Sequence, residues 1–186
     1  MDRFDTTLRE YFDASRAPAD LRLTLPAAAS ALDPEGTAAR FVIDASERGV
    51  RRVALAEGRG ESLGDRRHAE RARQELAEYL AGSRTFFSVP VDLSGLAEFE
   101  SEVLAAAARI PYGETTSYTA LADAVGRPRA ARAVGNACHN NPVAIIIPCH
   151  RVVAGGGKLG GYGGGLPLKR RLLALEHAQP ADGDLL

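Results

Sequence analysis

Residues 115–138 read TTSYTALADAVGRPRAARAVGNAC, and this stretch decides the fold that we predict for the second half of the chain. The hydroxyl side chains at 115–117 can cap the start of a helix, which we expect to run to about Val125. Gly126 is suited to end that helix, and Pro128 suits the first turn of a following one. A helix, a tight glycine-bearing turn and a second helix together predict a helix-turn-helix.

The second helix of this pair has a low side-chain profile. Its residues are mostly small, and Arg129, Arg132 and Asn136 fall on one face. A thin helix of this kind can approach the minor groove of DNA, which is about 6 Å wide and poor in sequence information, so it would read the backbone rather than the bases. The alternative is that the alanine face packs on the core and the arginines are solvated.

A second informative stretch, IPCHRVV at residues 147–153, lies a few residues further on. It closes an apolar run, residues 144–148, that we expect to be extended and buried. Cys149 stands directly before His150, and an imidazole beside a thiol lowers the cost of forming the nucleophilic thiolate. The alternative is an inert buried cysteine, which is a common role of free cysteine.

The segments around these two stretches complete a mainly helical C-terminal region. Residues 94–110 have helical apolar spacing, and residues 167–178 predict a closing helix. Between them, residues 154–165 hold eight glycines among twelve residues, which fits either a flexible linker or a loop that presses its backbone against a flat ligand.

The first half of the chain predicts a small α/β unit. Residues 41–43 and 50–55 are rich in β-forming residues on either side of a short polar turn, which is typical of an antiparallel hairpin. Residues 66–81 carry apolar side chains at helical spacing. Residues 1–36 show only one short candidate helix.

The bulk composition is that of an ordinary globular protein of 186 residues, with 45% hydrophobic and 25% charged residues. The net charge of −1 hides an asymmetry, because residues 109–176 carry +6 and the rest −7. That distribution fits a protein with one DNA-facing surface, although a solvated charged surface gives the same count. We expect a cytoplasmic protein without membrane spans, because no apolar run is long enough to cross a bilayer and the N-terminus is charged.

Four motifs occur in a fixed order: IPYGETTSYTALA (110–122), GRPRAARAVG (126–135), NPVAIIIPCHRVV (141–153) and the glycine loop with Tyr162. Together they resemble the O6-alkylguanine-DNA alkyltransferases, also called methylated-DNA–protein-cysteine methyltransferases. The resemblance is close from about Phe99 to Glu176 and weak before Val91. It implies direct-reversal DNA repair by an enzyme that moves the alkyl group of O6-alkylguanine onto its own cysteine, with O4-alkylthymine as a further candidate substrate.

The resemblance also implies a role for each catalytic residue. Cys149 is the acceptor, His150 takes its proton through a water molecule, and Glu176 orients His150. Tyr118 protonates guanine N3 as the base leaves, and Asn141 holds the backbone around the cysteine. Because the product is a thioether, which is a poor leaving group, we expect one irreversible turnover per molecule.

The remaining implied residues contact the flipped base or the duplex. Arg132 fills the gap left by the extruded nucleotide. The base-binding residues are Tyr162, Gly163, Gly164 and Val152, and the further DNA-binding residues are Arg129, Ala131, Ala133, Gly135, Asn136 and Arg151. We expect the partner to be double-stranded DNA, bound from the minor groove by a monomer without regard to sequence.

Two departures from the family pattern carry further expectations. Gly163 stands where relatives often have Ser, Thr or Arg, so we expect an open pocket wall that admits bulkier alkyl groups such as benzyl. Some relatives hold a structural zinc near the N-terminus, but here no cysteine precedes Cys138 and His68 stands alone, so we expect no metal and no cofactor.

The resemblance implies an N-terminal α/β domain (1–90) with a small antiparallel, ribonuclease-H-like sheet, a winged-helix-like C-terminal domain (91–178) with the helix-turn-helix, and a tail (179–186). Two other functions remain to be separated by experiment. One is lesion recognition without repair, against which Cys149 argues. The other is a cysteine hydrolase, against which the helix-turn-helix and Arg132 argue.

Overall fold

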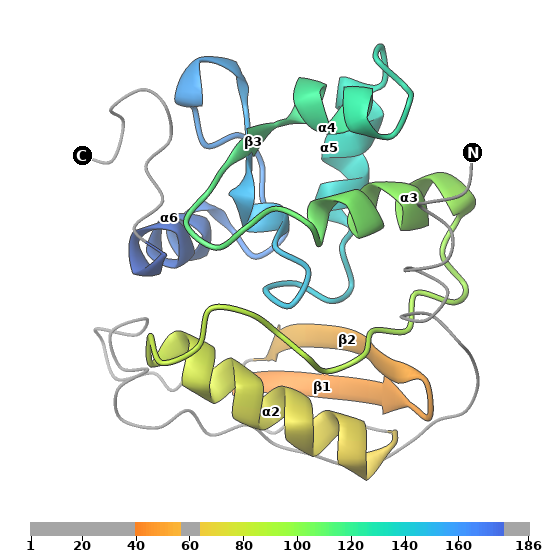
Figure 1. Cartoon of the computed structure of the whole chain (residues 1–186), viewed down its shortest axis with the longest axis vertical. Coiled ribbons are helices and arrows are strands. Elements are labelled where there is room, and N and C mark those ends of the chain that lie inside the picture. Colours follow the sequence, from red (N-terminus) through yellow and green to blue (C-terminus); the bar gives the residue numbers. More distant parts are fainter. Residues whose placement is uncertain (1–39, 57–63, 177–186) are drawn as a thin grey trace. The chain divides into compact units, whose positions relative to one another are not determined.

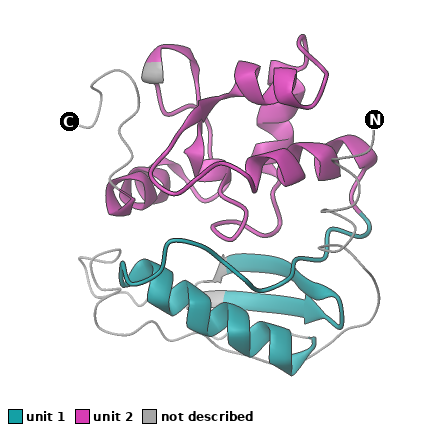
Figure 2. Cartoon of the chain, viewed as in Figure 1, with its two compact units in different colours: residues 1–95 teal, residues 96–186 magenta. Residues whose placement is uncertain are grey.

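The computed structural model describes residues 40–56 and 64–176, which form parts of two compact units. The units are Met1–Gly95 and Leu96–Leu186 (Figure 2). The sequence predicts a domain boundary at 90/91, five residues before the division between these units. The expectations for residues 1–36 and for the tail at 179–186 lie outside the described residues.

The first unit contains the predicted antiparallel hairpin. Strand β1 (Arg40–Ser46) pairs with β2 (Gly49–Ala56) (Figure 1). A bulge shifts the register between Asp44 and Ala45. Gly49 has a φ of 148°, and a side chain there would collide with the backbone of Pro90. Glycine at this position therefore lets the segment around Val91 pair with Val50 beside the hairpin.

Helix α2 (Arg66–Leu80) covers one face of this hairpin (Figure 1). It begins where the Asp65 side chain accepts from the His68 N–H at 2.9 Å, as expected of an N-cap. Its apolar face is buried together with apolar residues of both strands, which gives the unit its own core. The predicted hairpin and the predicted helix at 66–81 are both confirmed.

The second unit is mainly helical. Its α-helices are α3 (Glu98–Ala107), α4 (Tyr118–Ala124), α5 (Ala131–His139) and α6 (Leu166–Leu175). Ser117 caps α4, because its hydroxyl accepts from the Ala120 N–H at 3.0 Å. The predicted pair of helices on either side of Gly126 is therefore confirmed. The second helix begins later than expected, because Arg127–Ala130 forms a turn closed by a 2.8 Å hydrogen bond, and Arg129 lies in that turn.

Two very short strands join distant parts of this unit. Strand β3 (Thr116–Ser117; Figure 1) pairs in parallel with β4 (Val152–Val153). In this pairing Thr116 lies opposite Val152. This pairing fixes the start of α4 beside the segment that follows Cys149. None of the helices in residues 40–56 and 64–176 is long and apolar enough to cross a membrane.

Candidate active site

Cys149 begins a short 3-10 helix, η2 (Cys149–Arg151), and is buried with 2% of its surface exposed. The Asn141 side chain holds it from the side. Asn141 Nδ2 donates to Cys149 Sγ at 3.0 Å and to the Ile147 carbonyl at 3.0 Å, while Asn141 Oδ1 accepts from the Val143 N–H at 2.9 Å. Asn141 thus holds both the sulfur and the segment that leads to it.

The apolar run before Cys149 is buried, but the expectation that it is extended is wrong. The Ile147 N–H donates to the Val143 carbonyl at 2.9 Å, and Ile145 has a φ of 75°. A positive φ is unfavourable for a β-branched residue, so the surrounding packing must impose it. The turn brings Ile147 and Cys149 back within reach of Asn141, which an extended strand could not do.

The surroundings of Cys149 keep its sulfur protonated at neutral pH. Burial raises the pKa of the Cys149 thiol to about 11, although the hydrogen bond from Asn141 and the charge of Lys169 act in the opposite direction. Since the thiolate is the nucleophilic form, the site needs a base that removes the proton during the reaction.

His150 and Glu176 supply a buried imidazole–carboxylate pair. His150 Nε2 lies 2.9 Å from Glu176 Oε1, and the imidazole is fully buried. Burial lowers the pKa of His150 below its ordinary value of 6.5, against the opposing effect of Glu176. The imidazole is therefore neutral at pH 7 and can accept a proton.

Arg151 does not have the role that the sequence suggests. It is 6% exposed, and its guanidinium binds both oxygens of Glu176 at 2.8 to 3.1 Å and the Ile110 carbonyl at 2.5 Å. A side chain held in this way cannot reach a phosphate. The expectation that Arg151 binds DNA is therefore wrong.

Lys169 is a site residue that the sequence reasoning missed. Its ammonium is buried and donates to the carbonyls of Val152 (2.6 Å), Leu159 and Gly161 (3.2 Å). Burial lowers the pKa of Lys169 to about 8. Its spacing in the sequence could have predicted its burial. Lys169 lies three residues before Leu172, so both are on the buried face of α6, and seven residues before Glu176, which caps the end of the helix.

Tyr118 lies at the start of α4 against the glycine loop. Its hydroxyl donates to the Gly161 carbonyl at 2.9 Å, and burial raises the pKa of Tyr118 to about 12. Gly160 has a φ of 64°, and a Cβ there would lie 2.8 Å from the Tyr118 ring. Glycine at this position permits the loop to lie directly on the tyrosine.

Tyr162 in the same loop is buried, and its ring lies edge-on to the His150 ring with centroids 6.4 Å apart. Gly164 packs against it, since a Cβ there would lie 2.8 Å from the Tyr162 ring. Val152 is buried, and its carbonyl accepts from the Lys169 ammonium at 2.6 Å.

The expectation that Gly163 leaves an open pocket wall is wrong for the space that its missing side chain would occupy. The backbone carbonyl oxygen of His139 fills that position and would collide with a Cβ. The missing side chain therefore leaves no vacant space there, and the expectation that bulkier alkyl groups are accepted loses its basis.

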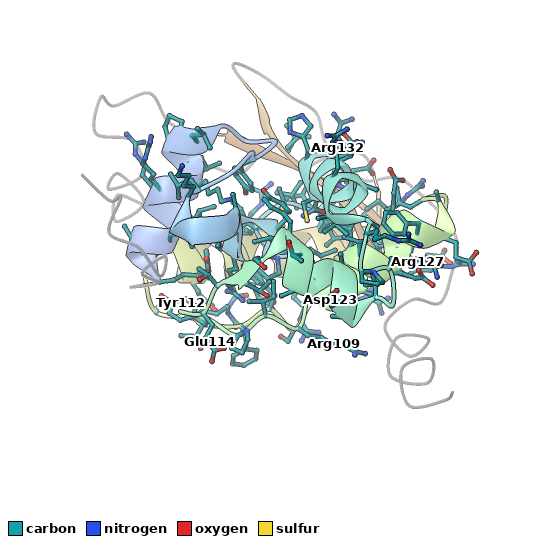
Figure 3. All side chains as sticks on the ribbon, turned by 90° about the horizontal axis from the view of Figure 1, so that it is seen from above. Arg109, Tyr112, Glu114, Asp123, Arg127 and Arg132 are labelled. Atoms are coloured by element: carbon teal, nitrogen blue, oxygen red, sulfur yellow. The ribbon has the colours of Figure 1, made fainter. Side chains whose placement is uncertain are left out.

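Helix α5 presents the predicted thin face. Arg132, Ala133 and Asn136 are exposed, and Arg132 projects outward in Figure 3. Ala131 and Gly135 are half-buried, and Gly135 lies close to the Tyr118 ring. Arg129 is exposed in the preceding turn, so it flanks the helix instead of lying on it.

No group of three or more His, Cys, Asp or Glu side chains that could hold a metal occurs among residues 40–56 and 64–176. Both cysteines are free and buried. The site therefore consists of a protonated thiol, a neutral imidazole with its carboxylate, Tyr162 on the glycine loop and Tyr118 of α4 against that loop. This arrangement suits nucleophilic chemistry by sulfur.

Comparison with known proteins gives a consistent result. Residues 98–178 match the family described as "6-O-methylguanine DNA methyltransferase, DNA binding domain". The methylated-DNA–protein-cysteine methyltransferase of Mycobacterium tuberculosis is 54% identical over 112 residues, which cover 60% of this chain and 67% of the relative. The corresponding protein of Methanosarcina barkeri is 37% identical over 142 residues, covering 73% of this chain and 89% of the relative.

A solved structure extends the similarity to most of the chain. The crystal structure of M. tuberculosis OGT in complex with DNA superposes with a TM-score of 0.66 and 37% identity. The match covers 86% of this chain and 95% of that one. The small antiparallel sheet followed by a helical part is therefore a shared architecture.

Proposed function

The chain belongs to the methylated-DNA–protein-cysteine methyltransferase family, also described as the O6-methylguanine DNA methyltransferases, and from this premise we propose that Cys149 is its alkyl acceptor. The activity is repair of alkylated DNA by transfer of a methyl group from O6-methylguanine to a protein cysteine. The observation that carries the assignment to Cys149 is its position next to the His150–Glu176 pair, under the Asn141 side chain.

The reaction is a displacement at the methyl carbon. The sulfur of Cys149 forms a bond to that carbon, the bond between carbon and guanine O6 breaks, and the thiol proton passes to His150 through a water molecule. His150 is fit to take it because burial lowers its pKa and leaves it neutral. The product thioether is a poor leaving group, so each molecule reacts once and irreversibly.

Tyr118 supplies the proton that the departing guanine needs at N3. Its hydroxyl can exchange its present acceptor, the Gly161 carbonyl, for the base. A phenol with a pKa of about 12 is a weak acid, so it gives up its proton only to the strongly basic leaving group and recovers it afterwards.

The flipped base lies against Tyr162 and the backbone of Gly163 and Gly164, and the carbonyl of Val152 contacts its edge. Flipping is required because O6 of a stacked base is out of reach, and it costs a few kcal/mol. Arg132 enters the duplex in place of the nucleotide, and the small residues of α5 allow the close approach. The other contacts come from Arg129, Ala131, Ala133, Gly135 and Asn136.

We extend the proposal to the mode of binding and the setting. The protein acts as a monomer on the minor groove without sequence preference, because lesions occur in any sequence and a thin helix reads little of the bases. The sheet of the first unit is of the ribonuclease-H type, and the second unit is a winged-helix domain. The protein works in the cytoplasm and needs neither a metal nor a cofactor. Its second substrate is O4-alkylthymine in DNA.

Intact-mass measurement tests this function. After mixing with an O6-methylguanine duplex, the protein should gain one methyl group, located on the Cys149 peptide. Cys149→Ala should bind the duplex and gain nothing, while Cys138→Ala, the matched control at the other buried cysteine, should still gain the methyl group. Methylation at another residue, or repeated turnover by one molecule, contradicts the proposal.

A further inference from the structure

Arg151 directs its charge into the protein. Its Nε and Nη2 donate to the Glu176 carboxylate at 2.8 to 3.1 Å, and its Nη1 donates to the Ile110 carbonyl at 2.5 Å. Both partners of this ion pair are buried, with 7% and 0% of their side chains exposed. A buried carboxylate remains ionised only where a cation or strong donors compensate its charge, and Arg151 provides both.

The same carboxylate oxygen serves two partners. Glu176 Oε1 accepts from Arg151 Nη2 at 2.8 Å and lies 2.9 Å from His150 Nε2. An ionised carboxylate can only accept hydrogen bonds, so Nε2 must carry the proton of the neutral imidazole. The lone pair of His150 is then on Nδ1, the nitrogen that remains to act as a base.

We infer that Arg151 is a positioning residue for the proposed reaction: by keeping Glu176 ionised, it fixes His150 in the tautomer whose Nδ1 can take the proton of Cys149. This inference rests on the proposed function of Cys149. It assigns to Arg151 a role in proton transfer in place of the DNA contact that the sequence suggests.

Charge balance shows what removal of Arg151 would do. With Arg151 present, the buried group of arginine, carboxylate and neutral imidazole is uncharged overall. Without it, the carboxylate alone would leave a buried negative charge, so the Glu176–His150 pair would take up a proton at neutral pH. If that proton makes the imidazole a cation, its lone pair is lost. If it is on the carboxyl instead, the carboxylic O–H donates to His150 Nε2 and the imidazole proton moves to Nδ1, so Nδ1 can no longer accept the proton of Cys149.

Other groups that face His150 do not explain such a change. They are Lys169 from α6 and Tyr162 from the glycine loop, and Cys149 precedes His150 in η2. Lys169 has a pKa of about 8 and Cys149 a pKa of about 11, so both titrate at alkaline pH. Because these groups are present in the wild type and in a variant at 151, the comparison between the two proteins isolates Arg151.

The test is the pH dependence of methyl transfer by Arg151→Met, followed by intact mass under single-turnover conditions with excess O6-methylguanine duplex. We expect the variant to react about 10-fold or more slowly than wild type at pH 7, and within about 3-fold of wild type at pH 9, where the pair loses its extra proton. The rate of the variant should rise from its acid minimum at a higher pH than the rate of wild type. Arg71→Met, which removes an arginine from an ion pair with Glu75 in the first unit, should follow the wild-type profile.

Three results would overturn the inference. One is a rate lowered equally at pH 7 and pH 9, which indicates a purely structural role. The second is a normal rate profile with weakened, less salt-dependent binding of the duplex, which indicates a DNA contact. The third needs no variant: long-range proton–nitrogen NMR correlations of the wild-type protein should show the His150 proton on Nε2, and a proton on Nδ1 would contradict the inference.

A second variant covers the case in which Arg151→Met does not fold. Arg151→Lys keeps the charge but loses the fork that binds both carboxylate oxygens, so its acid limb should move in the same direction by a smaller amount. Failure of this inference is distinct from failure of the proposed function. If wild type gains no methyl group the function is wrong, whereas if wild type reacts and neither variant moves the acid limb, only the inference is wrong.

Discussion

Lys169→Met should change how the stability of the protein depends on pH. The ammonium of Lys169 is buried against three backbone carbonyls, and burial lowers its pKa from 10.5 to about 8. That difference corresponds to about 3 kcal/mol, which is the cost of keeping the buried group charged. Since the unfolded chain holds the proton up to pH 10.5 and the folded chain only to about pH 8, wild type gains this stability as pH rises between the two values.

The variant lacks this gain but has a cost of its own. Methionine cannot donate to the carbonyls of Val152, Leu159 and Gly161, and each buried acceptor without a partner costs about 1 to 3 kcal/mol. We therefore expect Lys169→Met to be less stable than wild type at pH 7, and the gap to widen by about 3 kcal/mol towards pH 10.5.

Urea unfolding of both proteins at several pH values between 7 and 10.5 measures this gap. Both buried thiols also titrate at alkaline pH, but they are present in both proteins and largely cancel in the difference. Lys158→Met, which removes an exposed lysine of the glycine loop, is the matched control. A gap between wild type and Lys169→Met that stays constant over this pH range would refute the reasoning.

Two further substitutions test the contacts that support the site. Asn141→Ala removes the donor to Cys149 Sγ and to the Ile147 carbonyl, and also the acceptor of the Val143 N–H. It should therefore lower the free energy of unfolding by about 2 to 4 kcal/mol and slow methyl uptake. An unchanged midpoint of urea unfolding would contradict this. Gly163→Ala must displace the His139 carbonyl and should lower the Tm by several degrees. Its control is Gly161→Ala, whose new Cβ meets nothing within 4 Å, so the Tm of this variant should stay close to that of wild type. Equal Tm values for the two variants would show that the loop accommodates a side chain at Gly163 without cost.

Local patterns were sufficient to predict most of the elements. The hydroxyl before α4, the glycine after it and the apolar spacing of α2 and α3 act within a few residues, so the chain itself carries the signal. The same holds for the thiol next to an imidazole, because Cys149 and His150 are neighbours in sequence.

The predictions failed at residues whose environment depends on a partner far away in the sequence. The resemblance implies that Arg151 binds DNA, but its side chain binds Glu176, which lies 25 residues further along the chain. Lys169 was overlooked because a lysine in a helix is usually solvated, whereas here three carbonyls of β4 and the glycine loop accept from its buried ammonium. The apolar run before Cys149 predicts an extended segment, but tertiary packing imposes a turn with a positive φ at Ile145.

The parallel pairing of β3 with β4 has a consequence for biosynthesis. It joins Thr116 to Val152, and the site then takes Lys169 and Glu176 from α6, which the ribosome makes afterwards. A nascent chain that ends before α6 lacks Lys169 and Glu176, so the region around Cys149 has neither the buried ammonium nor the imidazole–carboxylate pair. The nucleophile therefore acquires its chemistry only when translation has passed residue 176.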